Sequence, residues 1–319
     1  MQKPGNFKVC TVLGARPQFI KAGVLSSHIK KSEFLQEVII HTGQHYDVKM
    51  SDQFFIDLDI PKPDYQLAIN QLSHGAMTGR MLEKIEEILL HEHPDMLIVY
   101  GDTNSTLAGA LAAKKCNIAV AHVEAGLRSF NNKMPEEINR ILTDRISDLL
   151  FCPTKSAVKN LYDEGFKNIK AQIIQTGDIM EDAALAYSQK AMDLSNVLND
   201  NDLPKEYILC TIHRAENVKD YDRLKAIVDS INYVHKNIKE VVLTLHPGTK
   251  KALEDYRLDL NCVLIAPVGY IDMLMLIQNS SFIMTDSGGL QKEAFFLNKY
   301  CMTLRDETEW IELTEHNYN

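Results

Sequence analysis

The feature that most constrains the fold of this 319-residue chain is a regular alternation of short apolar runs with amphipathic helical stretches. Continuous apolar strands separated by helices are typical of a parallel sheet that is covered on both faces. We therefore predict an α/β fold built from doubly wound, Rossmann-like sheets. The predicted strands cover residues 7–13, 37–41, 96–100, 118–123, 149–152 and 171–175, and then 207–212, 240–245, 262–265 and 281–285.

The alternation pauses at residues 184–205, a polar helical stretch that ends in "NDNDLPKE" and is typical of a domain junction. A chain of 319 residues usually forms two domains. We predict an N-terminal Rossmann-like domain at residues 1–178 and a second Rossmann-like domain at residues 179–319, facing each other across a cleft.

Charge and composition exclude several classes of protein. The chain has 34 Lys and Arg against 43 Asp and Glu, which argues against a general nucleic-acid or membrane-surface binder. No apolar run approaches the ~20 residues that span a bilayer, and the N-terminal stretch lacks the apolar core of a signal peptide. The six cysteines form no CxxC pair, so we interpret them as reduced residues of a cytoplasmic protein and predict no metal site.

Polar clusters follow most of the predicted strands. The first half has "GARPQ", "TGQH", "GDTNST" and "HVEAGLR" in these places, and the second half has "HRAEN", "HPG" and "DSGG". In open parallel sheets, ligands bind beyond the carboxyl ends of the strands. The repeated placement therefore predicts a functional cleft at these ends.

Acidic residues are concentrated at two of the strand ends. Asp102 and Glu124 follow strands that we expect to be neighbours, and two carboxylates held close together are typical of acid–base sites. A helix cap that uses Thr106 is the structural alternative for Asp102. Glu136 and Glu137 could equally be first-turn acids favoured by a helix dipole. Spacing alone does not separate a base from a cap.

Three further features favour a phosphate ligand. In "TDSGGLQKEA" the amides of residues 287–289 would lie at a helix N-terminus, although a simple cap is the alternative. Arg16 and Lys21 of "GARPQFIKAG" could hold an anion, unless Arg16 pairs with a neighbouring carboxylate. His213 could be an acid or base, a phosphate donor, or a structural residue. The GxGxxG and Walker patterns are missing, so NAD and P-loop interpretations find no support.

Taken in order, "GARPQFIKAG", "TGQH", "GDTNST", "HVEAGLRS…PEEINR", "HRAEN" and "TDSGGLQKEA" resemble the non-hydrolysing UDP-N-acetylglucosamine 2-epimerase family. The resemblance implies a GT-B-like architecture and interconversion of UDP-GlcNAc and UDP-ManNAc. In that reaction UDP is eliminated and then added back, through 2-acetamidoglucal, without a cofactor or a required metal. The resemblance also implies a UDP-sugar ligand and a homodimer.

The resemblance assigns residues motif by motif. It implies catalytic roles for Asp102, Glu124, Glu136 and His213. It implies UDP-sugar contacts for Arg16, Lys21, Ser287, Gly288, Gly289 and Glu293. It implies an allosteric UDP-sugar site at Gln44, His45 and Arg80.

Two departures from the family pattern leave the sugar open. "GARPQ" stands where many members have GTRPE, and "TEWIE" where they have TERPE. Both variants resemble a branch that acts on UDP-2,3-diacetamido-2,3-dideoxy-glucuronate, an intermediate of bacterial surface polysaccharides. Family members also continue beyond the last residue of this chain, so we expect a truncated second domain. The same motifs are compatible with a nucleotide-sugar sensor or inactive homologue, and with a retaining GT-B glycosyltransferase.

Overall fold

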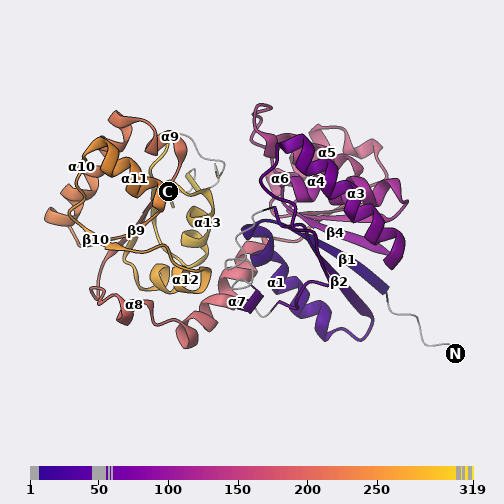
Figure 1. The fold of residues 1–319 in the computed structure, drawn as a ribbon, viewed down its shortest axis with the longest axis horizontal. Coiled ribbons are helices and arrows are strands. Elements are labelled where there is room, and N and C mark those ends of the chain that lie inside the picture. The colour runs from indigo at the N-terminus through magenta and orange to yellow at the C-terminus, as the bar shows by residue number, and fades with distance from the viewer. Residues whose placement is uncertain are drawn as a thin grey trace. The chain divides into compact units, whose positions relative to one another are not determined.

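The computed structural model describes residues 7–44, 55–56, 58, 60–306, 310, 313–314 and 318–319. The chain divides into two compact units, Met1–Ala183 and Ala184–Asn319. Helix α7 (Ile179–Leu194) contains the division between them. Each unit has its own sheet, and Figure 1 shows the first unit in indigo to magenta and the second in orange to yellow.

The first unit is built on a parallel sheet. Its described residues form seven strands in the order β3-β2-β1-β4-β5-β6-β7. Their bounds are β1 (Phe7–Leu13), β2 (Leu35–His41), β3 (Tyr65–Gln66), β4 (Met96–Tyr100), β5 (Ala119–Val123), β6 (Leu149–Cys152) and β7 (Gln172–Gln175). The order reverses direction between β1 and β4, which is where a doubly wound sheet opens its ligand crevice.

Helices cover both faces of this sheet. Helix α1 (Arg16–Lys31) lies on one face, and the opposite face carries the helices that follow β3, β4, β5 and β6 (Figure 1). These are α3 (His74–Glu92), α4 (Asn104–Lys115), α5 (Pro135–Ile146) and α6 (Lys155–Asp163), with a short 3₁₀ turn at Phe166–Asn168.

Helix α4 shows how the sequence sets the packing around the β4 end. Its alanines at 108, 110, 112 and 113 are fully buried, because small residues let neighbouring elements approach closely. A Cβ added at Gly109 would lie 3.2 Å from Val12 and 3.3 Å from Val99. The helix is therefore seated tightly against β1 and β4, and its N-terminus is fixed beside their carboxyl ends.

The second unit repeats the pattern with a parallel sheet whose described strands have the order β10-β9-β8-β11-β12. The strands are β8 (Ile208–Ile212), β9 (Val241–Leu245), β10 (Val263–Ile265), β11 (Phe282–Thr285) and β12 (Cys301–Thr303). The helices are α8 (Val197–Asp200), α9 (Ala215–Val218), α10 (Tyr221–Asn237), α11 (Pro247–Tyr256), α12 (Tyr270–Asn279) and α13 (Gly288–Phe296). Leu224 and Val228 of α10 pack with Cys210 and Leu243 of the sheet in a buried core.

The predicted parallel, doubly wound sheets are confirmed. All ten runs predicted as strands form strands, with ends shifted by a residue or two in several cases. The sequence prediction missed β3 and β12, which have two and three residues and are too short to show a period. Among the described residues, no helix is both long and apolar enough to cross a bilayer.

Candidate functional site

Asp102 and Glu124 follow two strands that are paired in register. Tyr100, the last residue of β4, is the partner of Val123, the last residue of β5. The Gly101 amide donates a hydrogen bond to the Val123 carbonyl at 3.0 Å. The structure therefore brings the Asp102 and Glu124 backbones to the same edge of the sheet, as predicted from the strand order.

The backbone turns sharply at both strand ends. Gly101 has φ +61° and Glu124 has φ +73°. A left-handed conformation is ordinary for glycine but uncommon for glutamate, and such strain is concentrated at functional sites. The amides of Glu124 and Ala125 both donate to the Phe151 carbonyl of β6, at 3.1 and 3.0 Å. These two hydrogen bonds hold Glu124 in this conformation.

The Glu124 carboxylate forms an ion pair with Lys21 of α1. The Lys21 ammonium contacts Glu124 Oε2, and the two side chains are only 8% and 11% exposed. Such burial strengthens the attraction between the charges and makes loss of either partner costly. A Cβ added at Gly101 would lie 3.3 Å from both Lys21 Nζ and Glu124 Oε2, so a residue without a side chain suits this position.

Asp102 is held by α5. Arg140 contacts Asp102 Oδ2, and Asn139 Nδ2 donates to the Asp102 carbonyl at 2.9 Å. The alternative interpretation of Asp102 as a cap is wrong, because Thr103 is the N-cap of α4 and accepts from the Thr106 amide at 3.3 Å. The Asp102 side chain is thus oriented by an arginine and not by the helix that follows it.

The two glutamates at the start of α5 differ in their surroundings. Glu136 is exposed in the first turn, whereas Glu137 is 1% exposed. The Glu137 carboxylate accepts from the amides of Ser129 and Phe130, at 3.0 and 2.9 Å, and pairs with Arg140 at 3.1 Å. Glu137 therefore ties the preceding loop to the helix, which leaves Glu136 as the glutamate of this pair that faces solvent.

The "GARPQ" loop is organised by Gln18, a residue for which the sequence predicted no role. Helix α1 begins at Arg16, which is half-buried. Gln18 is 1% exposed, accepts from the amides of Gly14 and Ala15 at 2.8 and 3.0 Å, and donates to the Tyr100 carbonyl at 2.8 Å. The signal was a glutamine at the third helical position, where a capping box places one.

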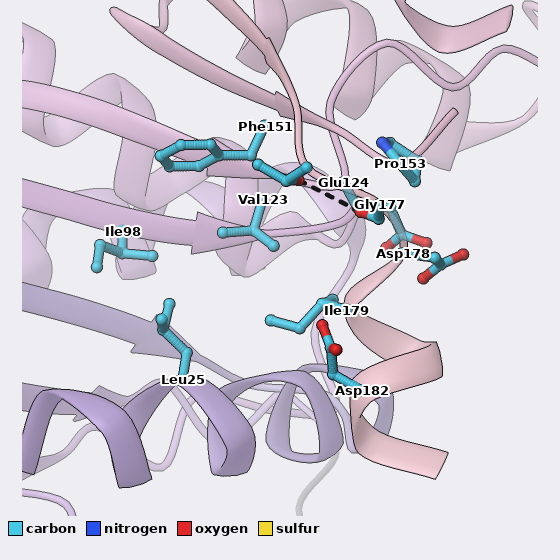
Figure 2. A pocket seen from close by; sticks show the side chains of 11 residues that line it. Leu25, Ile98, Val123, Glu124, Phe151, Pro153, Gly177, Asp178, Ile179 and Asp182 are labelled. Carbon is cyan, nitrogen blue, oxygen red and sulfur yellow. Dashed lines mark hydrogen bonds between the residues drawn. The ribbon is translucent and has the colours of Figure 1, made fainter. Parts of the chain in front are cut away.

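A pocket of about 210 Å³ borders Glu124 within the first unit. Figure 2 shows Ile98, Val123, Leu25 and Ile179 around it, with Glu124 at one end and its hydrogen-bonded neighbour Phe151 beside it. The remaining lining residues are Pro153, Thr176, Gly177, Asp178 and Asp182. Apolar walls lower the local dielectric, so the Lys21–Glu124 pair acts more strongly than it would in water.

In the second unit, Asp286 organises the loop that carries His213. Asp286 is fully buried and accepts from the amides of His213 and Arg214, at 3.1 and 2.9 Å, and from Asn217 Nδ2 at 3.0 Å. His213 Nδ1 lies 3.3 Å from Asp286 Oδ1, while the His213 side chain is 44% exposed. The ring of His246 lies 6.2 Å away, centroid to centroid. The carboxylate thus fixes a partly exposed imidazole at the end of β8.

The "TDSGG" turn starts α13 in the same unit. Ser287 is the N-cap, and its hydroxyl accepts from the Leu290 amide at 3.4 Å. Gly288 and Gly289 form the first turn, where helix amides and dipole favour an anion. Glu293 is buried on the same helix, at 7% exposure. The predicted cap is therefore present at this turn, while the Ser287 amide donates to the Thr285 hydroxyl at 2.9 Å.

The residues assigned to an allosteric site fall in different surroundings. Gln44 accepts from the Ser105 amide and hydroxyl, at 3.0 and 2.8 Å. Arg80 lines a pocket of about 490 Å³ with Gln66 and Asn70, and Gln44 does not belong to its described lining. His45 lies outside the described residues.

Comparison with known proteins identifies the family. The family model described as UDP-N-acetylglucosamine 2-epimerase matches residues 27–319. The UDP-2,3-diacetamido-2,3-dideoxy-D-glucuronate 2-epimerase of Pseudomonas aeruginosa is 54% identical over 306 residues, which is 96% of this chain and 85% of that protein. The UDP-N-acetylglucosamine 2-epimerase of Methanocaldococcus jannaschii is 44% identical over 322 residues, or 98% of this chain and 87% of the relative.

Solved structures agree. The Methanocaldococcus jannaschii UDP-GlcNAc 2-epimerase in complex with UDP-GlcNAc and UDP has a TM-score of 0.84 and 45% identity, over 97% of this chain and 86% of that one. The Neisseria meningitidis enzyme bound to UDP-GlcNAc has a TM-score of 0.85 and 33% identity, over 97% and 85%. The predicted GT-B-like α/β fold class is thereby confirmed. With its motifs, its sheets and these relatives in agreement, the chain belongs to the UDP-N-acetylglucosamine 2-epimerase family.

Proposed function

We propose that this protein is an isomerase that inverts C2 of a UDP-linked 2-acetamido sugar. The observation that carries the proposal is the buried Lys21–Glu124 pair beside Asp102, at the carboxyl ends of β4 and β5. A rigidly held carboxylate can accept a proton in the reaction, and a neighbouring cation can stabilise negative charge that develops in the transition state. The bound UDP-GlcNAc and UDP named for the Methanocaldococcus jannaschii structure support the ligand class.

In this reaction one carboxylate of Asp102, Glu124 and Glu136 takes the C2 proton. The C1–O bond to the diphosphate breaks, and UDP leaves with the electron pair. UDP then adds back to the 2-acetamidoglucal, and a proton is returned to the opposite face of C2. Because the proton leaves one face of C2 and returns to the opposite face, proton-transfer groups are needed on both sides of the sugar. Several carboxylates are assigned for this reason.

The second unit supplies the nucleotide site in this proposal. Ser287, Gly288 and Gly289 present the α13 N-terminus to the diphosphate, and Glu293 accepts from the ribose. His213, which is held by Asp286, stabilises the negative charge that develops on the leaving diphosphate. Arg16 of the first unit adds a cation. We assign proton transfer to a domain of residues 1–178 and UDP binding to a domain of residues 179–319.

UDP-N-acetylglucosamine is the first candidate sugar, and a second is favoured by one observation. The Pseudomonas aeruginosa relative at 54% identity is named for UDP-2,3-diacetamido-2,3-dideoxy-D-glucuronate, whereas the Methanocaldococcus jannaschii relative named for UDP-N-acetylglucosamine is 44% identical. Both sugars carry an acetamido group at C2, so the acid–base residues serve either. An NMR time course recorded with each UDP-sugar in turn separates the two candidates.

Incubation in deuterated water tests the reaction itself. We expect deuterium at C2 of recovered UDP-sugar, and Glu124→Gln should lower the exchange rate by about 100-fold or more while UDP binding is retained. Recovery of UDP-sugar with hydrogen at C2 would exclude the proposed proton transfer. Binding without exchange would favour a nucleotide-sugar sensor, and transfer of the sugar to an acceptor would favour a glycosyltransferase.

Three further assignments follow from the sequence. We propose a cytoplasmic protein because of its unpaired cysteines, and the family resemblance adds a homodimer and an allosteric UDP-sugar site that involves Gln44, His45 and Arg80. Sedimentation of the purified protein measures its oligomeric state. Arg80→Ala tests the allosteric site. If the site is regulatory, the variant should show a changed dependence of rate on UDP-sugar concentration but an unchanged rate at saturating UDP-sugar.

A further inference from the structure

His122 of β5 is a fully buried histidine that the proposed chemistry leaves without a task. Its two ring nitrogens contact different groups. Nδ1 lies 2.7 Å from Asp144 Oδ1 of α5, and Nε2 lies 2.7 Å from the Gly101 carbonyl oxygen. Both distances are those of strong hydrogen bonds.

Both contacts orient the ring. The Gly101 carbonyl oxygen only accepts, so Nε2 carries the proton of that hydrogen bond. Asp144 is itself held in place, because its second oxygen accepts from Arg128 Nη1 at 2.7 Å and from the Gly126 amide at 3.1 Å. The imidazole therefore bridges a fixed carboxylate of α5 and the Gly101 carbonyl.

Asp144 is fixed in turn through its arginine partner. Arg128 is also paired with Glu164, at 2.6 and 2.8 Å, and the Glu164 side chain is 33% exposed. The nearby Cys152 thiol stays neutral, because burial raises its pKa to about 12.

The imidazole acts on the residue that precedes Asp102. The Gly101 amide donates to the Val123 carbonyl, and the Gly101 carbonyl accepts from His122. The peptide groups on both sides of the Gly101 Cα are thereby tied to β5, the strand that ends one residue before Glu124. A residue at φ +61° with both of its backbone polar groups bonded has little freedom to rotate.

We propose that His122 is a positioning residue which holds Gly101 by a hydrogen bond and so fixes the Asp102 carboxylate relative to Glu124. This inference rests on the proposed proton-transfer function of those two carboxylates. His122 does not touch substrate in this scheme. It acts by holding the β4 and β5 ends in one geometry, on which transfer to and from opposite faces of C2 depends.

The hydrogen bond to Gly101 is tested first, without any activity measurement. In protein labelled with ¹⁵N-histidine, the His122 signal, identified by its loss in His122→Gln, should show a proton on Nε2 that is protected from exchange with solvent. A proton on Nδ1 alone, or rapid exchange of the Nε2 proton, would overturn the proposal. This outcome is independent of whether the protein is an epimerase.

The positioning role is tested with His122→Gln in deuterated water. The Gln amide carries both of its N–H donors on one nitrogen, so it cannot bridge Asp144 and Gly101 as the two ring nitrogens do. We expect exchange at C2 to fall by about 10- to 100-fold in kcat, with KM and UDP binding changed less than threefold. The control is Ile85→Val, which trims a fully buried side chain of α3 and should lower Tm while leaving kcat unchanged.

The outcomes separate three cases. Wild-type protein that exchanges no C2 hydrogen contradicts the proposed function. Exchange by wild type together with full kcat in His122→Gln contradicts the positioning role. A kcat loss in His122→Gln that Ile85→Val reproduces at equal Tm loss also contradicts it, because general destabilisation would then explain the effect.

Discussion

At the scale of a single residue, Glu124 combines a buried ion pair with an unfavourable backbone conformation. Its carboxylate is paired with Lys21, and its backbone has φ +73°. A left-handed conformation costs an L-residue roughly 1–2 kcal/mol relative to the right-handed one. The hydrogen bonds to Phe151 hold the backbone of residue 124 in this conformation. A glutamate therefore occupies a position whose backbone conformation glycine would adopt at lower cost.

This strain gives a stability prediction. Glu124→Gly and Glu124→Ala remove the same ion pair, but only glycine relieves the backbone. We expect Glu124→Gly to be about 1 kcal/mol more stable to urea than Glu124→Ala, with both inactive in C2 exchange. Equal unfolding free energies for the two variants would show that the backbone at residue 124 relaxes in the alanine variant.

Individual residues also show where sequence reasoning succeeds and where it stops. The proximity of Asp102 and Glu124 was predictable, because neighbouring parallel strands end at one edge. The contact between Arg140 and Asp102 was not, because it depends on how α5 is seated against the sheet. The double hydrogen bonding of His122 was equally hidden, since a buried histidine in a strand has the same sequence pattern whatever its partners are.

At the scale of elements, one polar cluster joins β3, α3 and β1. The Tyr65 hydroxyl of β3 donates to Glu92 Oε1, and Lys8 of β1 donates to Glu92 Oε2 at 2.9 Å. The hydrogen bond from Tyr65, followed by that from Lys8, lowers the pKa of Glu92 to about 2. The two-residue strand β3 is thus anchored by side chains as well as by its few backbone bonds.

The anchor predicts a pH-dependent stability. The folded-state pKa of Glu92 lies below its ordinary 4.5, so the contribution is complete above about pH 4.5 and is lost as pH falls toward about 2. Glu92→Gln should cost roughly 1 kcal/mol in urea unfolding at about pH 7 and much less at about pH 3. Glu87→Gln, which removes an exposed pair with Lys84 on the same helix, is the control and should cost almost nothing. A Glu92→Gln cost that is the same at both pH values would contradict the assignment.

Elements of different length were predictable to different degrees. Most strands contain a run of consecutive apolar residues, and these were predicted, including the three-residue strand β10. The short strands β3 and β12 carry no such run and depend on a neighbouring strand for pairing. These two strands lie at the edges of their sheets and depend on tertiary contacts, which cannot be read from the sequence.

At the scale of the whole molecule, two separately cored units hold buried thiols that can report on each. Cys10 and Cys152 lie in the first unit, and Cys210 and Cys301 in the second. Burial raises the pKa of Cys10, Cys152 and Cys301 to about 12, and it also raises the pKa of Cys210 well above its usual range. Alkylation of these thiols at neutral pH therefore requires opening of the unit that contains them.

UDP should protect these thiols unequally. If UDP binds the second unit and the units open separately, UDP at about 100 times its Kd slows alkylation of Cys210 and Cys301 by about 100-fold. Cys10 and Cys152 should be labelled at nearly the rate seen without ligand, and ADP serves as the control nucleotide. Equal protection of all four thiols would show that the two units open as one.

Asp286 gives the second unit a property that matters for engineering. Its one carboxylate binds the loop that follows β8 to the turn that follows β11, although the two are about seventy positions apart in the chain. The "HRAEN" and "TDSGG" segments are therefore held together as one structural unit. A chimera that exchanges "TDSGG" for a turn without this aspartate would leave the His213 loop without its anchor, so the two segments have to be transplanted together.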